Sequence, residues 1–507
     1  MDRRRFLKTA GRAAAAAAAW PALSRAAVPP PADARPNVVL VFADQWRAQA
    51  AGYAGDPNVR TPALDRLAAR SVRFTTAVSN CPVCAPYRAS LLTGRYPLTH
   101  GVFLNDVCLS ADAVSLAQAF KGAGYRTAYV GKWHLDGHGR SAFIPPDRRQ
   151  GFDFWRVLEC THDYNKSAYY GDENSKSFWQ GYDAAAQTRE AQGYLRAAAG
   201  KGPFLLVLSW GPPHNPYETA PPKYRDMYRP EKLTLRPNVP PDRAEAARRD
   251  LAGYYAHCSA LDDCVARLRE TLCDWGLDEN TIFVFTSDHG DMLGSQGMQR
   301  KQCPYDESIL VPLLVHWPRL TREGRTVAAP IGAPDIMPTL LGLAGIEIPK
   351  TVEGADFSGR LRGGPASAAG PAPAAGPAPA DGPEPAEGPE PAYGPEPAYG
   401  GALIACYAPF GELPRARGGR EYRGLRTARH TYVRTLEGPW LLFDNQADPY
   451  QQQNLCNLPE HAAVQNRMEV LLQARLRQTH DDFRPAETYV RKWRYVTDKT
   501  GTVPYAP

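Results

Sequence analysis

The chain has 507 residues, of which 43% are hydrophobic and 22% charged, so it can bury a large core in two or three domains and is not an unfolded polar chain. Its formal net charge is +6, but the first 27 residues hold six basic residues against one acidic residue, which leaves the rest of the chain almost neutral. No basic stripe remains to indicate a nucleic-acid partner, and ten cysteines are too few for a disulfide scaffold.

Residues 1–27 have the features of an export signal. The run RRRFLK at 3–8 resembles the twin-arginine pattern, and an alanine-rich stretch with small residues follows it. A merely basic N-terminus is the alternative. No later segment has 18 uninterrupted apolar residues, so we expect no membrane anchor and a periplasmic or extracellular protein exported by the twin-arginine route.

The segment 81–94, CPVCAPYRASLLTG, predicts a short helix over 85–93 with Cys84 at its start. Cys84 and Arg88 would share one face, and a helix N-terminus beside a guanidinium suits a divalent oxyanion. A buried thiol near a surface arginine is the plain alternative. Cys81 and Cys84 have redox-pair spacing, but no thioredoxin-like strand precedes them and no second pair completes a zinc site.

Four apolar runs predict buried strands, at 37–43, 125–130, 204–210 and 281–286. Helical patterns lie between them, notably at 115–122 and 254–275, and this alternation predicts an α/β fold with a large, mostly parallel sheet covered by helices on both faces.

Each of these strands leads into polar residues, and ligands of such sheets bind at the carboxyl ends of the strands. A single polar residue after a strand is often only a turn or cap residue, but four such ends in one chain indicate a site. One group is rich in oxygen donors and suits a hard divalent cation: Asp44, Gln45, Asp288 and His289. A second group offers positive charge and proton transfer to an anionic substrate: Arg88, Lys132, His134 and His214.

Several motifs then resemble one family in register. CAPYRASLLTG at 84–94 matches the Cys-x-Pro-x-Arg signature of the type I sulfatases, the formylglycine-dependent members of the alkaline-phosphatase superfamily. GKWH at 131–134, DHGD at 288–291 and KQCPYDESILVP at 301–312 match later motifs of the family in order, with Lys301 at its active-site lysine. The resemblance extends from residue 36 to about 455.

The resemblance implies a mechanism. A formylglycine-generating enzyme would oxidise Cys84 to formylglycine, and one hydroxyl of the aldehyde hydrate would attack sulfur and form a covalent sulfate ester while the alcohol leaves. The second hydroxyl would then collapse to the aldehyde and expel sulfate.

The family also implies the role of each matching residue. One divalent cation, usually Ca²⁺, would bind Asp44, Asp288, His289 and a formylglycine oxygen at position 84, with Gln45 as a further oxygen donor. Arg88 would orient the modified residue, supported by Lys132 and His134. The residues expected to bind the sulfate are Lys132, His214 and Lys301. Either His214 or Lys301 would protonate the leaving oxygen.

Two positions depart from the family pattern. Gln45 stands where many sulfatases have a second aspartate, and His289 stands where many have asparagine. The first change removes a negative charge, and the second admits Mn²⁺ or Zn²⁺, so we expect a weaker or differently selective cation site. His138 is more consistent with a surface loop than with a substrate contact.

The motifs divide the chain into a catalytic domain at 36–362, a Pro/Ala/Gly-rich insertion at 363–401, a C-terminal subdomain at 402–490 and a tail at 491–507. The insertion consists of near-repeats such as GPEPAEGPEPA, which predict a disordered linker; a binding role for its Pro-Glu-Pro units is the alternative. In the subdomain we expect antiparallel strands at 402–407, 422–427, 431–436 and 440–444 and a helix at 460–478, which together close one side of the pocket. The aromatic loop at 161–182 is expected to shape the pocket.

The leading hypothesis is therefore an exported sulfuric ester hydrolase that acts on a sulfated carbohydrate or aryl sulfate. A phosphonate monoester or phosphodiester hydrolase of the same superfamily is the nearest enzymatic alternative. From a different class, the chain could be a non-catalytic binder of sulfated ligands in which Cys84 is never converted.

Overall fold

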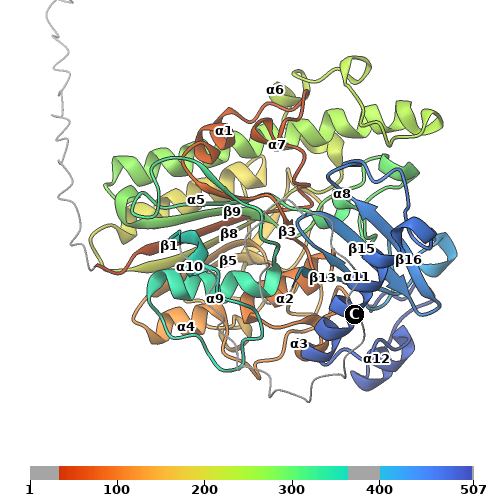
Figure 1. The fold of residues 1–507 in the computed structure, drawn as a ribbon. Helices are drawn as coiled ribbons and strands as arrows, with labels where there is room; N and C mark the ends of the chain where they lie inside the picture. The colour runs from red at the N-terminus through yellow and green to blue at the C-terminus, as the bar shows by residue number, and fades with distance from the viewer. Residues whose placement is uncertain (1–33, 364–399, 505–507) are drawn as a thin grey trace, which may run out of the picture.

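The computed structural model describes residues 34–363 and 400–504 (Figure 1). The expected signal at 1–27 and all but the ends of the expected linker at 363–401 lie outside these ranges. Within them, ten strands form one sheet in the order β11-β2-β10-β9-β1-β8-β4-β5-β6-β7, with helices on both faces (Figure 1). This confirms the expected α/β class.

The centre of the sheet is parallel; towards its margins the pairs β9·β10, β10·β2, β5·β6 and β6·β7 are antiparallel, whereas the edge strand β11 is parallel to β2. The parallel strands are β9 (Thr281–Ser287), β1 (Asn37–Asp44), β8 (Phe204–Pro213), β4 (Arg126–Lys132) and β5 (Phe154–Leu158). The outer strands are β11 (Arg325–Val327), β2 (Val72–Phe74), β10 (Leu313–His316), β6 (Ala168–Tyr170) and β7 (Lys176–Phe178). Because the central strands are parallel, their carboxyl ends meet at one edge of the sheet.

Helices on both faces account for the continuous apolar runs of the central strands (Figure 1). Alternate residues of β1, such as Leu40, pack into the core with α2 (Cys84–Thr93) and α9 (Ala333–Ala344). The residues between them, such as Val41, pack into the core with α5 (Asp183–Ala198) and α7 (Ala244–Asp274). The remaining helices of this domain are α1 (Pro62–Ala68), α3 (Pro97–His100), α4 (Leu116–Gly122), α6 (Pro222–Arg225), α8 (Asp306–Ile309) and α10 (Ser358–Leu361), and a small second sheet pairs β3 (Ala77–Val78) with β12 (Ile331–Gly332).

Two expectations about this domain need correction. The helix expected at 254–275 begins ten residues earlier, at Ala244, because its first turns are mostly half-buried and polar, with small alanines in place of most large apolar residues. The region expected as a loop at 161–182 contains β6 and β7. Each of these strands has three residues, which is too short for the alternation of apolar and polar residues that reveals a strand in the sequence.

The C-terminal subdomain has the expected antiparallel sheet, drawn in blue in Figure 1. Its strands are β13 (Ala402–Cys406), β14 (Tyr422–Arg426), β15 (His430–Thr435) and β16 (Gly438–Asp444), and its helices are α11 (Ala462–Gln478) and α12 (Ala486–Lys492). The tail residues Trp493 and Tyr495 pack against the core of the catalytic domain. Tyr495 also donates a hydrogen bond to the carbonyl of Gly101 at 2.9 Å, so the tail joins the two parts of the protein.

A buried ion pair holds the subdomain together and gives a testable prediction. Arg423 is completely buried; it pairs with Asp481 and donates to the carbonyls of Cys406 and Tyr422 at 3.0 Å. Arg423→Ala leaves the Asp481 charge buried and unpaired, so we expect the free energy of unfolding to fall by about 3–5 kcal/mol in urea denaturation. The exposed Arg484–Asp482 pair is the control, and Arg484→Ala should lower the free energy of unfolding by less than about 1 kcal/mol. Equal losses of stability in the two variants would contradict the prediction.

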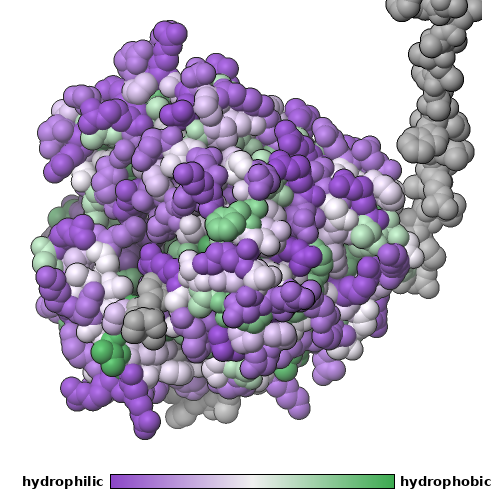
Figure 2. Space-filling view, turned by 180° about the vertical axis from the view of Figure 1, so that it is seen from behind, coloured by the Kyte–Doolittle hydropathy of each residue, from purple (hydrophilic) through white to green (hydrophobic). Residues whose placement is uncertain are grey.

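Among the described residues, no helix has the length and apolarity needed to cross a membrane. The face of the molecule in Figure 2 is mainly hydrophilic, with hydrophobic side chains scattered over it.

Candidate active site

The carboxyl ends of the central strands bring most of the predicted residues together. Asp44 ends β1, Lys132 ends β4, His214 directly follows β8, and Asp288 directly follows β9. Helix α2 begins with Cys84 and approaches the same edge, and its end at Gly94 has the left-handed conformation that glycine favours (φ 66°).

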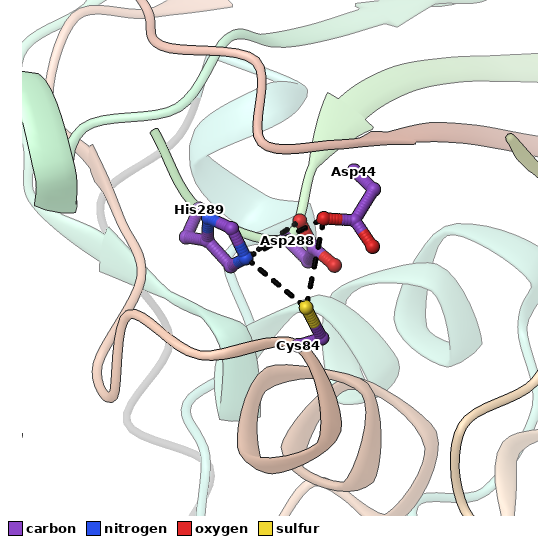
Figure 3. Close-up of side chains that lie close together, drawn as sticks. All are labelled: Asp44, Cys84, Asp288 and His289. Atoms are coloured by element: carbon purple, nitrogen blue, oxygen red, sulfur yellow. Dashed lines mark hydrogen bonds and ion pairs between the residues drawn. The ribbon is translucent and has the colours of Figure 1, made fainter. Parts of the chain in front are cut away.

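Four buried side chains form the centre of this site (Figure 3): Asp44, Cys84, Asp288 and His289. One potential ligand atom from each lies within 4.8 Å of all the others. The Cys84 Sγ is 3.3 Å from His289 Nε2 and 3.6 Å from Asp44 Oδ1, and His289 Nε2 is 3.5 Å from Asp44 Oδ1. Cys84 is 2% exposed and the other three are completely buried, so these charges are shielded from solvent.

The environment of His289 directs its Nε2 lone pair into this cluster. Its Nδ1 lies 2.9 Å from the carbonyl of Gly290, so Nδ1 carries the proton and donates it there. Burial and the charge of Lys301 lower the pKa of His289, which keeps the ring neutral. A side chain at position 290 is excluded, because a Cβ there would lie 2.0 Å from the carbonyl oxygen of Glu307.

Two buried cations neutralise the outer oxygens of the carboxylates. Arg88 Nη2 donates to Asp44 Oδ2 at 3.2 Å and to Asp288 Oδ2 at 2.9 Å, and Lys132 Nζ donates to Asp44 Oδ2 at 2.6 Å. Burial raises the pKa of Asp44, but the charges of Lys132 and Arg88 lower it by more, so the carboxyl is ionised. The Oδ1 atoms of both carboxylates therefore face the cluster, and with the His289 nitrogen they suit a divalent cation.

Lys301 links the cluster to His214. The Lys301 Nζ is 2.9 Å from His214 Nε2, 2.7 Å from Gln45 Oε1 and 3.9 Å from Cys84 Sγ. His214 Nδ1 donates to the carbonyl of Asn215 at 2.8 Å, so its Nε2 accepts from the ammonium. Burial and Lys301 hold the pKa of His214 well below its usual value, whereas Cys84, Glu412 and Asp44 outweigh burial and raise that of Lys301 to about 12. The shared proton therefore resides on Lys301.

Comparison with known proteins agrees with this geometry. A sequence model of the family described as Sulfatase matches residues 36–346. The chain belongs to the sulfatase family. An ulvan-active sulfatase of Formosa agariphila is 46% identical over 478 residues, which cover 93% of this chain and 87% of that protein. An endo-4-O-sulfatase of Bacteroides thetaiotaomicron is 31% identical over 477 residues, which cover 83% of this chain and 88% of that protein.

A solved structure extends the similarity to three dimensions. It is a Bacteroides thetaiotaomicron protein from work on the metabolism of multiple glycosaminoglycans. The two structures align with a TM-score of 0.75 and 28% sequence identity, and the alignment covers 93% of this chain and 100% of that one. The protein is therefore a sulfatase, a hydrolase of sulfate esters, with a candidate site for the metal ion that the family uses.

Two of the predicted site residues, Gln45 and His134, are not part of the four-residue cluster. The Gln45 Nε2 donates to Asp291 Oδ2 at 2.6 Å and its oxygen accepts from Lys301, so the amide spans these two residues; metal ligation by Gln45 remains a prediction. His134 lies further out, where its Nε2 contacts Asp106 Oδ1 at 2.7 Å. The side chain of His138 is 52% exposed, on a surface loop.

Two residues at the site were missed in the motifs. The ring of His162 stacks on His214, with centroids 4.5 Å apart and an angle of 7°. The Glu412 carboxylate, from the C-terminal subdomain, lies 3.3 Å from Lys301 Nζ. His162 falls in the loop expected to shape the pocket, whereas nothing in the sequence around Glu412 marks it.

The state of Cys84 bears on the chemistry. Burial and the neighbouring Asp44 raise the pKa of the Cys84 thiol to about 12, so the unmodified side chain is a protonated thiol and a poor nucleophile. Cys81 and Cys84 are both free and buried, so in this structure they do not form the disulfide that their spacing allows.

Proposed function

We propose that this sulfatase hydrolyses the sulfate monoesters of a sulfated polysaccharide of the ulvan type, or of its oligosaccharides. The observation that carries the proposal is the 46% identity with an ulvan-active sulfatase over 93% of this chain. The buried cations Arg88, Lys132 and Lys301 supply the positive surroundings that a sulfate group needs.

In this proposal Cys84 is converted to formylglycine by a formylglycine-generating enzyme. The hydrate of that aldehyde supplies a hydroxyl nucleophile, which the protonated thiol cannot replace. Position 84 is suited to the task because it starts helix α2, whose N-terminus favours negative charge, and because it lies 3.9 Å from Lys301 Nζ. Arg88 holds the carboxylates of Asp44 and Asp288 in place beside it.

The proposed proton donor is the pair formed by Lys301 and His214. Lys301 holds the proton in the resting state and donates it toward His214 Nε2, so either nitrogen can deliver it to the leaving oxygen of the sugar. Lys132, which is 6% exposed, combines its bond to Asp44 with a contact to the sulfate. His134 supports the segment that follows Lys132 by pairing with Asp106.

We further propose that Asp44, Asp288, His289 and residue 84 bind one Ca²⁺ ion, which as a Lewis acid would polarise the sulfate. We expect about one calcium per chain by elemental analysis of purified protein. A chelator should remove most of the activity, and added Ca²⁺ should restore it. Stoichiometric zinc, or full activity in the chelator, would contradict the assignment.

The proposed location is the periplasm or the extracellular space, reached by the twin-arginine route. The support is the run RRRFLK at 3–8. Changing both Arg3 and Arg4 to lysine should retain the protein in the cytoplasm, as measured by cell fractionation.

The decisive experiment measures sulfate release from ulvan oligosaccharides by the mature protein. The same preparation is tested on 4-nitrophenyl sulfate and on bis(4-nitrophenyl) phosphate. We expect sulfate release from the oligosaccharides and hydrolysis of the aryl sulfate. A higher kcat/KM on the phosphodiester would instead support the phosphodiesterase alternative, and activity on the aryl sulfate alone would overturn the ulvan-type substrate.

A further inference from the structure

The carboxylate of Glu412 lies beside the site that is proposed to bind the sulfate group. Glu412 lies in the connection between β13 and β14, and its Oε2 is 3.3 Å from Lys301 Nζ. Lys301 is 3% exposed and already donates to Gln45 Oε1 at 2.7 Å and contacts His214 Nε2 at 2.9 Å. Glu412 is the outermost of the three partners, because a third of its side chain (33%) is exposed.

The charge of Glu412 opposes the binding of sulfate. Burial raises the pKa of Glu412, but the charges of Lys301 and Arg300 lower it by more, so the carboxylate is ionised. A negative charge next to the sulfate site repels the substrate through surroundings that screen charge poorly. Such a residue favours a substrate only if the substrate donates a hydrogen bond to it, and bonds to an ionised acceptor are stronger than neutral ones.

Resting on the proposed function, we propose that Glu412 is a specificity-determining residue that accepts a hydrogen bond from a sugar hydroxyl next to the scissile sulfate ester. The sulfated ring is then a neutral sugar with a free neighbouring hydroxyl. A ring with a carboxylate or a second sulfate at that position is rejected, because two negative charges would meet without a donor between them.

The test compares Glu412→Gln with the wild type on two substrates that differ only in the hydroxyl next to the scissile sulfate ester. One is a sulfated ulvan oligosaccharide, and the other is its analogue without the hydroxyl next to the sulfate. For the wild type, we expect kcat/KM on the deoxy analogue to be at least ~10-fold lower than on the hydroxylated substrate. For the variant, we expect the two kcat/KM values to agree within about 3-fold. On a ring with a second sulfate, the variant should exceed the wild type by about 10-fold.

The control is Glu460→Gln, which makes the same charge change at an exposed position of the same subdomain and should leave all rates unchanged. If Glu412→Gln slows both substrates equally, Glu412 acts through Lys301 and the proposal is wrong. It is also wrong if the wild type does not discriminate between them. Failure of the wild type on ulvan overturns only the proposed substrate, because the same pair can be built on any sulfated sugar that it hydrolyses.

Discussion

Cys84→Ala is expected to abolish sulfate ester hydrolysis, with a fall in kcat/KM of at least ~10⁴-fold on 4-nitrophenyl sulfate. In the proposed mechanism residue 84 supplies the nucleophile, and it lies in one cluster with Asp44, Asp288 and His289. The fold should be preserved, because alanine keeps the start of helix α2 and removes only a sulfur atom. Mass spectrometry of the wild-type peptide 81–94 should show the mass of formylglycine in place of cysteine.

Cys81→Ala is the matched control for this experiment. Cys81 is also buried, at 3% exposure, and lies three residues from Cys84, but it is not one of the four residues of the cluster. Its replacement should therefore leave kcat/KM within about 3-fold of the wild type. An active Cys84→Ala protein, or an unmodified thiol in a fully active wild type, would disprove the formylglycine nucleophile.

Asp44→Asn is expected to release the metal ion and to lower kcat/KM by about 10³-fold. The carboxylate of Asp44 serves both sides of the site: its Oδ2 accepts from Lys132 and Arg88, and its Oδ1 faces the cluster. An amide has one oxygen and no charge, so it cannot neutralise two buried cations and ligate a divalent ion as well. Elemental analysis and the rate on 4-nitrophenyl sulfate measure the two effects.

Asp262→Asn controls for the loss of a buried carboxylate elsewhere. Asp262 is 2% exposed and accepts from the backbone N–H groups of Ala63 and Leu64 at the start of α1. Its variant should keep the metal content and the rate of the wild type. If Asp44→Asn retains its metal, Asp44 is not a ligand and the proposed cation site is wrong.

The sheet and the centre of the site could be predicted because both follow from local sequence. A strand covered on both faces, such as the run 37–43, must be apolar almost throughout, and the first charged residue after it marks the carboxyl end of the strand. Asp44 and Asp288 could therefore be assigned to the same edge, and the structure places their Oδ1 atoms close to one another around His289.

The rest of the site depends on contacts between distant segments. Glu412 reaches Lys301 from another subdomain, and its position depends on how β13 packs beside the catalytic domain. His162 stacks on His214 although 52 residues separate them, and a single aromatic residue in a loop carries no periodic signal. Similarly, the half-buried start of α7 is polar and alanine-rich and lacks the large apolar residues by which a buried helix is recognised.

Under the proposed mechanism, the burial of Cys84 would set the order in which this protein folds and is modified. At 2% exposure, with a complete helix α2 and the Asp288 loop around it, the thiol is inaccessible to another enzyme once the chain has folded. The proposed oxidation must therefore take place on the nascent or unfolded segment. Under this proposal a molecule that folds first would be trapped as an inactive thiol form, and the active fraction of a preparation would reflect competition between the rate of folding and the supply of the modifying enzyme.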